Sequence, residues 1–157
     1  MNIQIAEARE EHLAEMFAWL RAEEEQCGEG FYCHRDVIVS SFQAGEVYCA
    51  FCEGQIAGFV VHNRKPIGSA IDLLEVRPEL RGRGLGKLLA DDVTERLFAM
   101  GAEFIEVQCA PRSSERFWRN RGFTPVTNER CSQWDAPRLI LCRPADRTSC
   151  NAQNRPA

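Results

Sequence analysis

The fold is decided by the stretch Val76-Arg77-Pro78-Glu79-Leu80-Arg81-Gly82-Arg83-Gly84-Leu85-Gly86-Lys87. A strand-like apolar run ends at Val76, and an apolar stripe with the period of a helix begins at Leu85. A strand, a glycine-rich loop and a helix in this order are typical of an anion site. The reason is that the first amides of a helix lack partners within the helix and carry the positive end of its dipole.

The loop combines small residues with positive charge. Its glycines remove side chains that would keep a phosphate away from the helix amides, and its cations favour a polyanion. These residues are Gly82, Gly84 and Gly86 together with Arg81, Arg83 and Lys87. A diphosphate fits them, but two nucleotide motifs do not: a P-loop has Ser or Thr where Leu88 follows Gly86-Lys87, and the glycine spacing differs from GxGxxG.

On both sides of this stretch the apolar pattern alternates between the periods of strands and helices. Strands are predicted at about 3–5, 47–52, 55–61, 70–76, 104–107, 123–126 and 138–142, and helices at about 9–25, 37–42, 85–100 and 112–121. The order βααβββαβαββ predicts an α/β (α+β) fold in which helices flank a mixed, mostly antiparallel sheet. We expect one domain over residues 1–143 and a polar, flexible tail over residues 144–157.

Composition narrows the class of protein. The chain has 157 residues and a net charge of −4, which disfavours nucleic acid as the main partner. No apolar run is long enough to span a membrane, and the N-terminus does not have the pattern of a secretory signal. These observations predict a cytoplasmic protein without a membrane partner.

Eight cysteines raise the question of metal or redox chemistry, and Cys49-Ala50-Phe51-Cys52 forms a CxxC pair. The pair lies in a strand-like run, and a second CxxC is absent from the sequence. We therefore expect the cysteines to be reduced, the two thiols of the CxxC pair to behave as small buried hydrophobic groups, and no metal site.

Three motifs in register resemble those of the GNAT superfamily of acyl-CoA-dependent N-acyltransferases. The loop Arg81-Gly82-Arg83-Gly84-Leu85-Gly86 fits the family's pattern of Arg or Gln, two residues, Gly, one residue, then Gly or Ala, and it follows Val76-Arg77-Pro78 as the family's V-x-P. Further on, Ile105-Glu106-Val107 resembles the L-E-V of the fifth strand, and Phe117-Trp118-Arg119-Asn120-Arg121-Gly122-Phe123 resembles F-Y-x-x-x-G-F. The resemblance covers residues 70–126.

The resemblance implies a splayed fourth and fifth strand with the pantetheine arm of CoA between them. The implied contacts with CoA are Leu74 and Val76 along the arm, Arg81, Gly82, Arg83, Gly84, Leu85, Gly86 and Lys87 at the diphosphate, and Pro111, Ser114 and Trp118 beside the arm or thioester. Acetyl-CoA is then the acyl donor. The implied reaction is direct attack on its thioester by a primary amine of a small molecule or peptide.

Three carboxylates are candidates for the base that deprotonates the amine. Asp72 lies where polyamine acetyltransferases of the family carry a catalytic carboxylate. Glu106 matches the glutamate that ribosomal-protein acetyltransferases use, and Glu75 lies beside the expected strand bulge. The oxyanion is expected to meet a backbone N–H near Val76 that this bulge exposes.

Two positions depart from the family pattern. Trp118 stands where a tyrosine often protonates the leaving thiolate, and an indole N–H is not an acid near neutral pH. Pro111 stands where many relatives have asparagine, and proline lacks both a side-chain amide and a backbone N–H. These departures keep open an alternative, a non-catalytic acyl-CoA sensor on the same fold. Cys109 also leaves open a covalent acyl-cysteine route.

The acceptor is expected to be chosen by the first two predicted helices and the loop between them. Acidic side chains there could attract a cationic amine, although such a run is more often a solvated helix end. These residues are Glu23, Glu24, Glu25 and Glu29. Many members of the family dimerise, so a homodimer is among the expectations.

Overall fold

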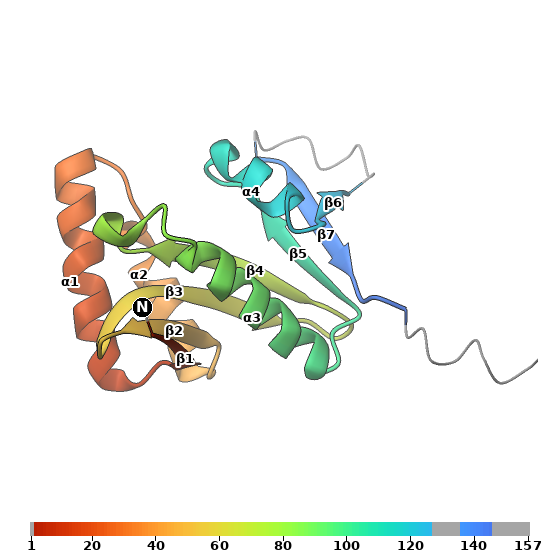
Figure 1. Cartoon of the computed structure of the whole chain (residues 1–157), viewed down its shortest axis with the longest axis horizontal. Helices are drawn as coiled ribbons and strands as arrows, with labels where there is room; N and C mark the ends of the chain where they lie inside the picture. The colour runs from red at the N-terminus through yellow and green to blue at the C-terminus, as the bar shows by residue number, and fades with distance from the viewer. Residues whose placement is uncertain (1, 127–135, 146–157) are drawn as a thin grey trace, which may run out of the picture.

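A computed structural model describes residues 2–126 and 136–145 of the chain. The elements follow the predicted order (Figure 1). They are β1 (Ile3–Glu7), α1 (Glu10–Cys27), α2 (Arg35–Gln43), β2 (Val47–Cys52), β3 (Gln55–Arg64), β4 (Ser69–Val76), α3 (Leu85–Ala99), β5 (Phe104–Gln108), α4 (Glu115–Arg119), β6 (Thr124–Pro125) and β7 (Arg138–Cys142). The predicted tail lies outside the described residues from position 146 onward, and the domain boundary at residue 143 stays a prediction.

The described strands form one mixed sheet in the order β1-β2-β3-β4-β5-β7-β6. Every neighbouring pair is antiparallel except β4 and β5, which run parallel. These two strands pair only where Ser69–Ile71 faces Ile105–Val107. Beyond Ile71 they diverge, as Figure 1 shows. The predicted splay between the fourth and fifth strands is therefore confirmed.

A bulge in β4 begins where the strands separate. Val61 of β3 pairs with Leu73 and His62 pairs with Ile71, so Asp72 is the extra residue. The expectation of a bulge beside Val76 is wrong. Pairing stays regular there because Gly58, opposite Val76, has no side chain to push β4 away.

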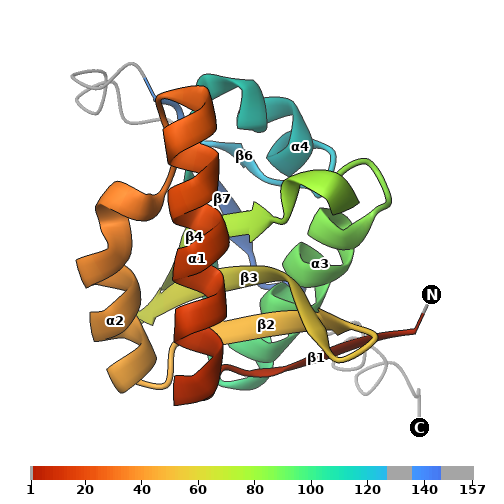
Figure 2. The same cartoon turned by 90° about the vertical axis from the view of Figure 1, so that its left-hand side faces the viewer.

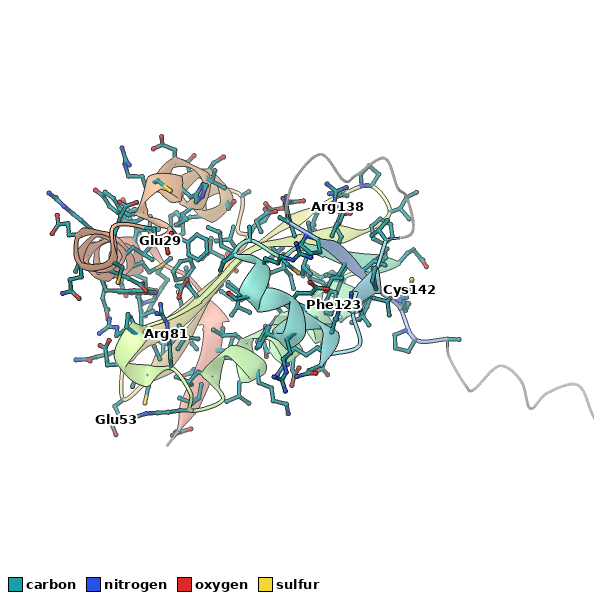
Figure 3. The ribbon with its side chains drawn as sticks, turned by 90° about the horizontal axis from the view of Figure 1, so that it is seen from above. Glu29, Glu53, Arg81, Phe123, Arg138 and Cys142 are labelled. Carbon is teal, nitrogen blue, oxygen red and sulfur yellow. The ribbon has the colours of Figure 1, made fainter. Side chains whose placement is uncertain are left out.

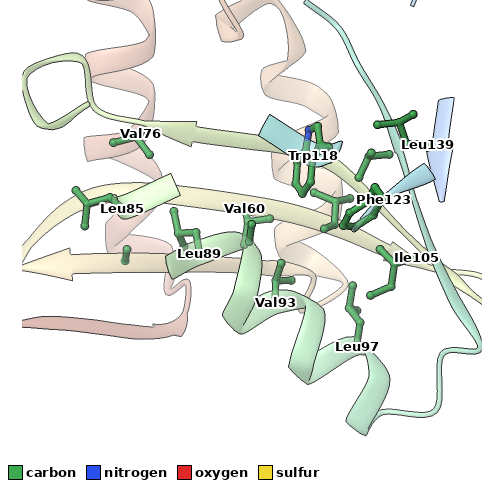
Figure 4. Close-up of a cluster of buried hydrophobic side chains, with 14 of the residues drawn as sticks. Val60, Val76, Leu85, Leu89, Val93, Leu97, Ile105, Trp118, Phe123 and Leu139 are labelled. Carbon is green, nitrogen blue, oxygen red and sulfur yellow. The ribbon is translucent and has the colours of Figure 1, made fainter. Parts of the chain in front are cut away.

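Helix α3 packs on one face of the sheet, and α1 and α2 pack on the other (Figure 2). On the α3 side, Leu85, Leu89, Val93 and Leu97 repeat every four residues and are buried against the strands, α4 and Phe123 (Figure 4). Two other apolar residues at or next to α3, Leu88 and Met100, are exposed. On the opposite face, buried residues of both helices surround Phe59; these include Met16, Leu20 and Ile38.

The CxxC thiols lie on opposite faces of the sheet. Cys49 is buried in the cluster beside Met16, where desolvation raises its pKa to about 12, whereas Cys52 packs against the cluster under α3. The two thiols therefore do not converge on one site. In the described part of the chain, no group of three or more His, Cys, Asp or Glu side chains could hold a metal ion. Cys131 and Cys150 lie outside that part.

Candidate active site

A cleft of about 610 Å³ opens where β4 and β5 separate. One wall is the second half of β4, and the other is the end of β5 with the chain that follows it and α4. The loop before α3 closes one end, and Phe31, from the segment between α1 and α2, borders the cleft. The predicted CoA residues that line it are Leu74, Val76, Arg81, Gly82, Gly84, Leu85, Gly86, Lys87, Pro111, Ser114 and Trp118; Arg83 lies outside the lining.

The glycine loop adopts a backbone that few other residues tolerate. Gly82 and Gly84 have φ values of 77° and 81°, in the left-handed region, and Gly84 is the N-cap of α3. The first hydrogen bond of the helix runs from the Leu88 amide to the Gly84 carbonyl. The amides of Leu85, Gly86 and Lys87 thus precede the helical ladder and border the cleft. This end of the cleft therefore has the backbone geometry that an anion site at a helix N-terminus requires.

The cations of this end are not all directed at the cleft. Lys87 lies 3.6 Å from Asp91 on the exposed surface of α3. Arg81 is held by protein groups: its Nε donates to the Val76 carbonyl at 2.9 Å, and its Nη2 lies 2.6 Å from both Glu23 and Glu75. These two carboxylates and the carbonyl already occupy much of the donor capacity of the Arg81 guanidinium.

Arg121 borders the same cleft and was not among the predicted site residues. Its guanidinium carbon lies 4.1 Å from the centre of the Phe117 ring, and its Nη1 donates to the Phe117 carbonyl at 3.0 Å. Its Nε is buried without a hydrogen-bond partner, 3.7 Å from Asp91. Residues 112–121 contain four arginines, and their spacing in the sequence does not show which of their side chains turns toward the cleft.

Two of the three candidate bases lie in the cleft. Asp72 and Glu75 line it, while Glu106 lies in the part of β5 that still pairs with β4, opposite Ala70. Glu106 forms a close ion pair with Lys65. Asp72 is exposed and accepts a hydrogen bond of 2.7 Å from Asn63. The geometry therefore brings Glu75 and Asp72 together with the glycine loop and leaves Glu106 outside the lining.

Glu75 is the more enclosed of the two cleft carboxylates. Its neighbours in β4, Leu74 and Val76, both pack on the face of the sheet that α3 covers. Because successive side chains of a strand point to opposite faces, the side chain of Glu75 points to the face that α1 covers. Its side chain is 13% exposed. Burial raises the pKa of Glu75 and the neighbouring Glu23 adds to this effect, whereas the Arg81 guanidinium opposes it. A carboxylate with a raised pKa is a stronger base than an ordinary glutamate.

The sequence profile of the Acetyltransferase (GNAT) family matches residues 6–123, which is well over half of the chain. The chain belongs to this family. A search of curated protein sequences gives no match. Among residues 2–126 and 136–145, no helix is long and apolar enough to cross a membrane.

Solved structures of GNAT proteins share this fold. The PaiA N-acetyltransferase from Thermoplasma acidophilum, in complex with coenzyme A, is 13% identical with a TM-score of 0.75, over 91% of this chain and all (100%) of the other. A GNAT acetyltransferase from Brucella melitensis, in complex with acetyl-CoA, is 15% identical with a TM-score of 0.69. This match covers 90% of the present chain and 88% of the Brucella chain. N-acetylglutamate synthase from Neisseria gonorrhoeae, complexed with coenzyme A and N-acetyl-glutamate, is 16% identical with a TM-score of 0.72. That match covers 90% of this chain but 35% of the synthase.

Trp118 lines the GNAT cleft while most of its ring is buried. It meets Phe117 and Phe123 edge-to-face, with ring centres 5.0 and 5.2 Å away. This packing makes Trp118 part of the core that holds α4 beside β5. Next to it, the Ser114 hydroxyl donates to the Pro111 carbonyl at 2.8 Å and fixes the turn that enters α4.

Cys109 is buried at the end of β5 and is not a lining residue of the cleft. Burial raises its pKa, an effect that a hydrogen bond with Ser114 partly offsets. The thiolate, which is the nucleophilic form, is therefore disfavoured at this position.

Two of the acidic residues that were expected to attract a cationic amine are paired with arginines of the protein. Glu23 is largely buried in its contact with Arg81, and Glu25 pairs with Arg21 on the surface at 3.0 Å. Glu29 is exposed and lies in the segment that follows α1, where Figure 3 labels it. Of the segment between α1 and α2, it is the aromatic ring of Phe31 that borders the cleft.

Proposed function

We propose that this GNAT protein transfers an acetyl group from acetyl-CoA to a primary amine by direct attack in a ternary complex. One observation supports the proposal most: a single cleft joins the anion-binding loop before α3 to a desolvated carboxylate, Glu75. Binding of a diphosphate and deprotonation of an amine are the two tasks that this reaction requires. The relatives crystallised with CoA or acetyl-CoA add support for the donor.

The residues of the cleft suit the parts of acetyl-CoA. The amides at the start of α3, with Lys87 and Arg121, would hold the diphosphate. Leu74, Val76 and Val107 offer apolar surface to the pantetheine arm. When bound, acetyl-CoA supplies a thioester that an amine can attack.

Glu75 is the base in this proposal, because it is buried and lies on the wall of the cleft that faces α1 and Phe31. Asp72 is the second candidate: it shares the lining, but it is exposed to water and already accepts a hydrogen bond from Asn63. Glu106 is the third, since its ion pair with Lys65 engages the carboxylate outside the lining.

The departing thiolate needs little help from an acid. A comparable thiol has a pKa of about 8.5, so it leaves far more readily than an alkoxide. The indole of Trp118 can donate a hydrogen bond but not a proton. We therefore assign Trp118 to packing and to the wall of the cleft.

A non-catalytic acyl-CoA sensor is the second candidate, and Trp118 and Pro111 favour it. Release of free thiol from acetyl-CoA, measured with a panel of primary amines, separates the two functions. The proposal expects amine-dependent release for at least one class of amine. A protein that binds CoA but releases no thiol with any amine would be a sensor.

Replacing Gly84 by valine should weaken CoA binding by at least tenfold. A β-branched residue resists the left-handed backbone at this N-cap, and the strain of about 1–2 kcal/mol would displace the first amides of α3. Titration calorimetry with CoA gives the dissociation constant. The matched control is Gly54→Val, the same change at another left-handed glycine (φ 80°), which lies in the turn between β2 and β3 and outside the lining of the cleft; its CoA affinity should match wild type. Equal affinity in wild type and Gly84→Val would argue against this loop as the diphosphate site.

Replacing Cys109 by alanine should leave at least half of the amine-dependent thiol release. The buried thiol is mostly protonated near neutral pH, and direct attack does not use it. Mass spectrometry of the protein after incubation with acetyl-CoA alone is the companion measurement. An acetylated Cys109 together with an inactive Cys109→Ala variant would replace direct attack by a covalent route.

A further inference from the structure

Arg81 connects helix α1 to the cleft, because it contacts Glu23 of α1 and Glu75 of β4. Arg81 lies on the loop beside α1 (Figure 3), and its Nη2 lies 2.6 Å from a carboxylate oxygen of Glu23 and 2.6 Å from one of Glu75. We propose that Glu23 is a positioning residue for the reaction, which acts through Arg81 to hold the Glu75 carboxylate in place. The inference rests on the proposed role of Glu75 as the base.

The geometry of the three groups is closely fixed. The Glu23 and Glu75 side chains are 14% and 13% exposed, so both carboxylates are largely removed from water. The Arg81 Nε is bound to the Val76 carbonyl, which anchors the guanidinium to the end of β4. An arginine held at its Nε can turn little about its side-chain bonds, so the carboxylates on its outer nitrogen are fixed as well.

Helix α1 itself is fastened to the same region at a second point. Glu15, about two turns before Glu23, lies 2.7 Å from Arg77 and also accepts a hydrogen bond from the Ile56 amide at 3.1 Å. Arg77 and Arg81 flank the turn that leads from β4 to the glycine loop. The helix is thus fixed at two points against this turn, which fixes the position of Glu23 relative to Glu75.

The charges around Glu75 give Glu23 a measurable effect. The charged groups that act on the Glu75 carboxylate are Arg81 from the loop and Glu23 from α1; Phe59 is its partner on β3, and Gln108 faces the cleft from β5. Glu23 raises the pKa of Glu75 and Arg81 lowers it. Removing the charge of Glu23 should lower the pKa of Glu75, and removing the charge of Arg81 should raise it further.

The test follows kcat/KM for the amine against pH in wild type, Glu23→Gln and Arg81→Gln, at saturating acetyl-CoA. The acid limb reports the ionisation of the base in the complex with acetyl-CoA before the amine binds, and the ionisation of the amine is common to all variants. For Glu23→Gln we expect the limb to move to lower pH by about half a unit or more, and kcat to fall about fivefold. For Arg81→Gln the limb should move to higher pH.

Two further variants separate charge from fit. Glu25→Gln is the matched control, because it makes the same change on the same helix but at an exposed pair with Arg21; its profile should match wild type. Glu23→Asp keeps the charge with a shorter reach, so its acid limb should stay within about 0.2 pH units of wild type while kcat falls. Urea denaturation of each variant shows that the folded protein is being assayed.

The failure of this inference differs from the failure of the proposed base. If Glu23→Gln loses stability but keeps the wild-type acid limb and kcat, Glu23 only fastens α1 and the positioning role is wrong. If Glu75→Gln keeps both the acid limb and the kcat of the wild type, Glu75 is not the base, whatever Glu23 does.

Discussion

Replacing Glu75 by glutamine should lower kcat for acetyl transfer by about a hundredfold to a thousandfold. The amide keeps the size and polarity of the side chain but cannot take a proton from the attacking amine, and general base catalysis contributes on this scale. CoA affinity should change by less than about threefold, because Glu75 is on β4 and is not among the residues assigned to the diphosphate or the pantetheine arm. Steady-state kinetics and CoA titration on the same preparation provide both numbers.

The comparison variants are Asp72→Asn and Glu106→Gln, which remove the other two candidate carboxylates. The proposal expects a smaller fall in kcat for each than for Glu75→Gln. If Asp72→Asn loses the hundredfold and Glu75→Gln does not, the base is the exposed carboxylate at the strand bulge. If the large loss appears in Glu106→Gln, its ion pair with Lys65 must open before the reaction.

The pH dependence provides an independent check on the same residue. Burial raises the pKa of Glu75 above that of an ordinary glutamate. The base is active when deprotonated, so activity should fall as the pH drops through this raised pKa, and it should fall at a higher pH than an exposed glutamate would give. In the residual activity of Glu75→Gln, the contribution of Glu75 to the acid limb should disappear and only the ionisation of the amine should remain.

The sequence was sufficient for the scaffold and for the conformation of the glycine loop at one end of the cleft. The left-handed Gly82 and Gly84, the apolar stripe of α3 and the end of β4 at Val76 are all consequences of local residue order. Each of these features depends on neighbours in the chain, so pattern and spacing predict them well. The splay of β4 and β5 came instead from resemblance to the GNAT family.

Side-chain partners far apart in the chain could not be predicted in this way. The contact of Arg81 with Glu23 joins positions 58 residues apart, and that of Lys65 with Glu106 joins positions 41 residues apart. Such pairs depend on how α1 and the β3–β4 turn pack, which no local pattern contains. For the same reason the sequence assigned Arg81 wholly to the diphosphate, and did not separate Glu75 from Glu106.

Replacing Gly58 by alanine should destabilise the fold by about 3 kcal/mol and lower Tm by about 6–12 °C. A Cβ added to Gly58 would lie 2.6 Å from the Glu75 carbonyl oxygen, 3.0 Å from Leu89 and 3.3 Å from the Val76 Cα. Two of these three neighbours are backbone atoms of β4, so relief requires the strand to move away from β3. Differential scanning calorimetry measures the loss.

The matched control for this change is Gly30→Ala, also a glycine to alanine substitution. Its added Cβ would lie 3.5 Å from Glu24, an ordinary contact, and its backbone does not require a left-handed φ. Its Tm should stay within about 2 °C of wild type. Because β4 also carries Glu75 and one wall of the cleft, Gly58→Ala should weaken CoA binding even at temperatures where it is folded. A variant that loses neither stability nor affinity would mean that β3 and β4 can separate at Gly58 without cost, contrary to the close approach that keeps β4 regular up to Val76.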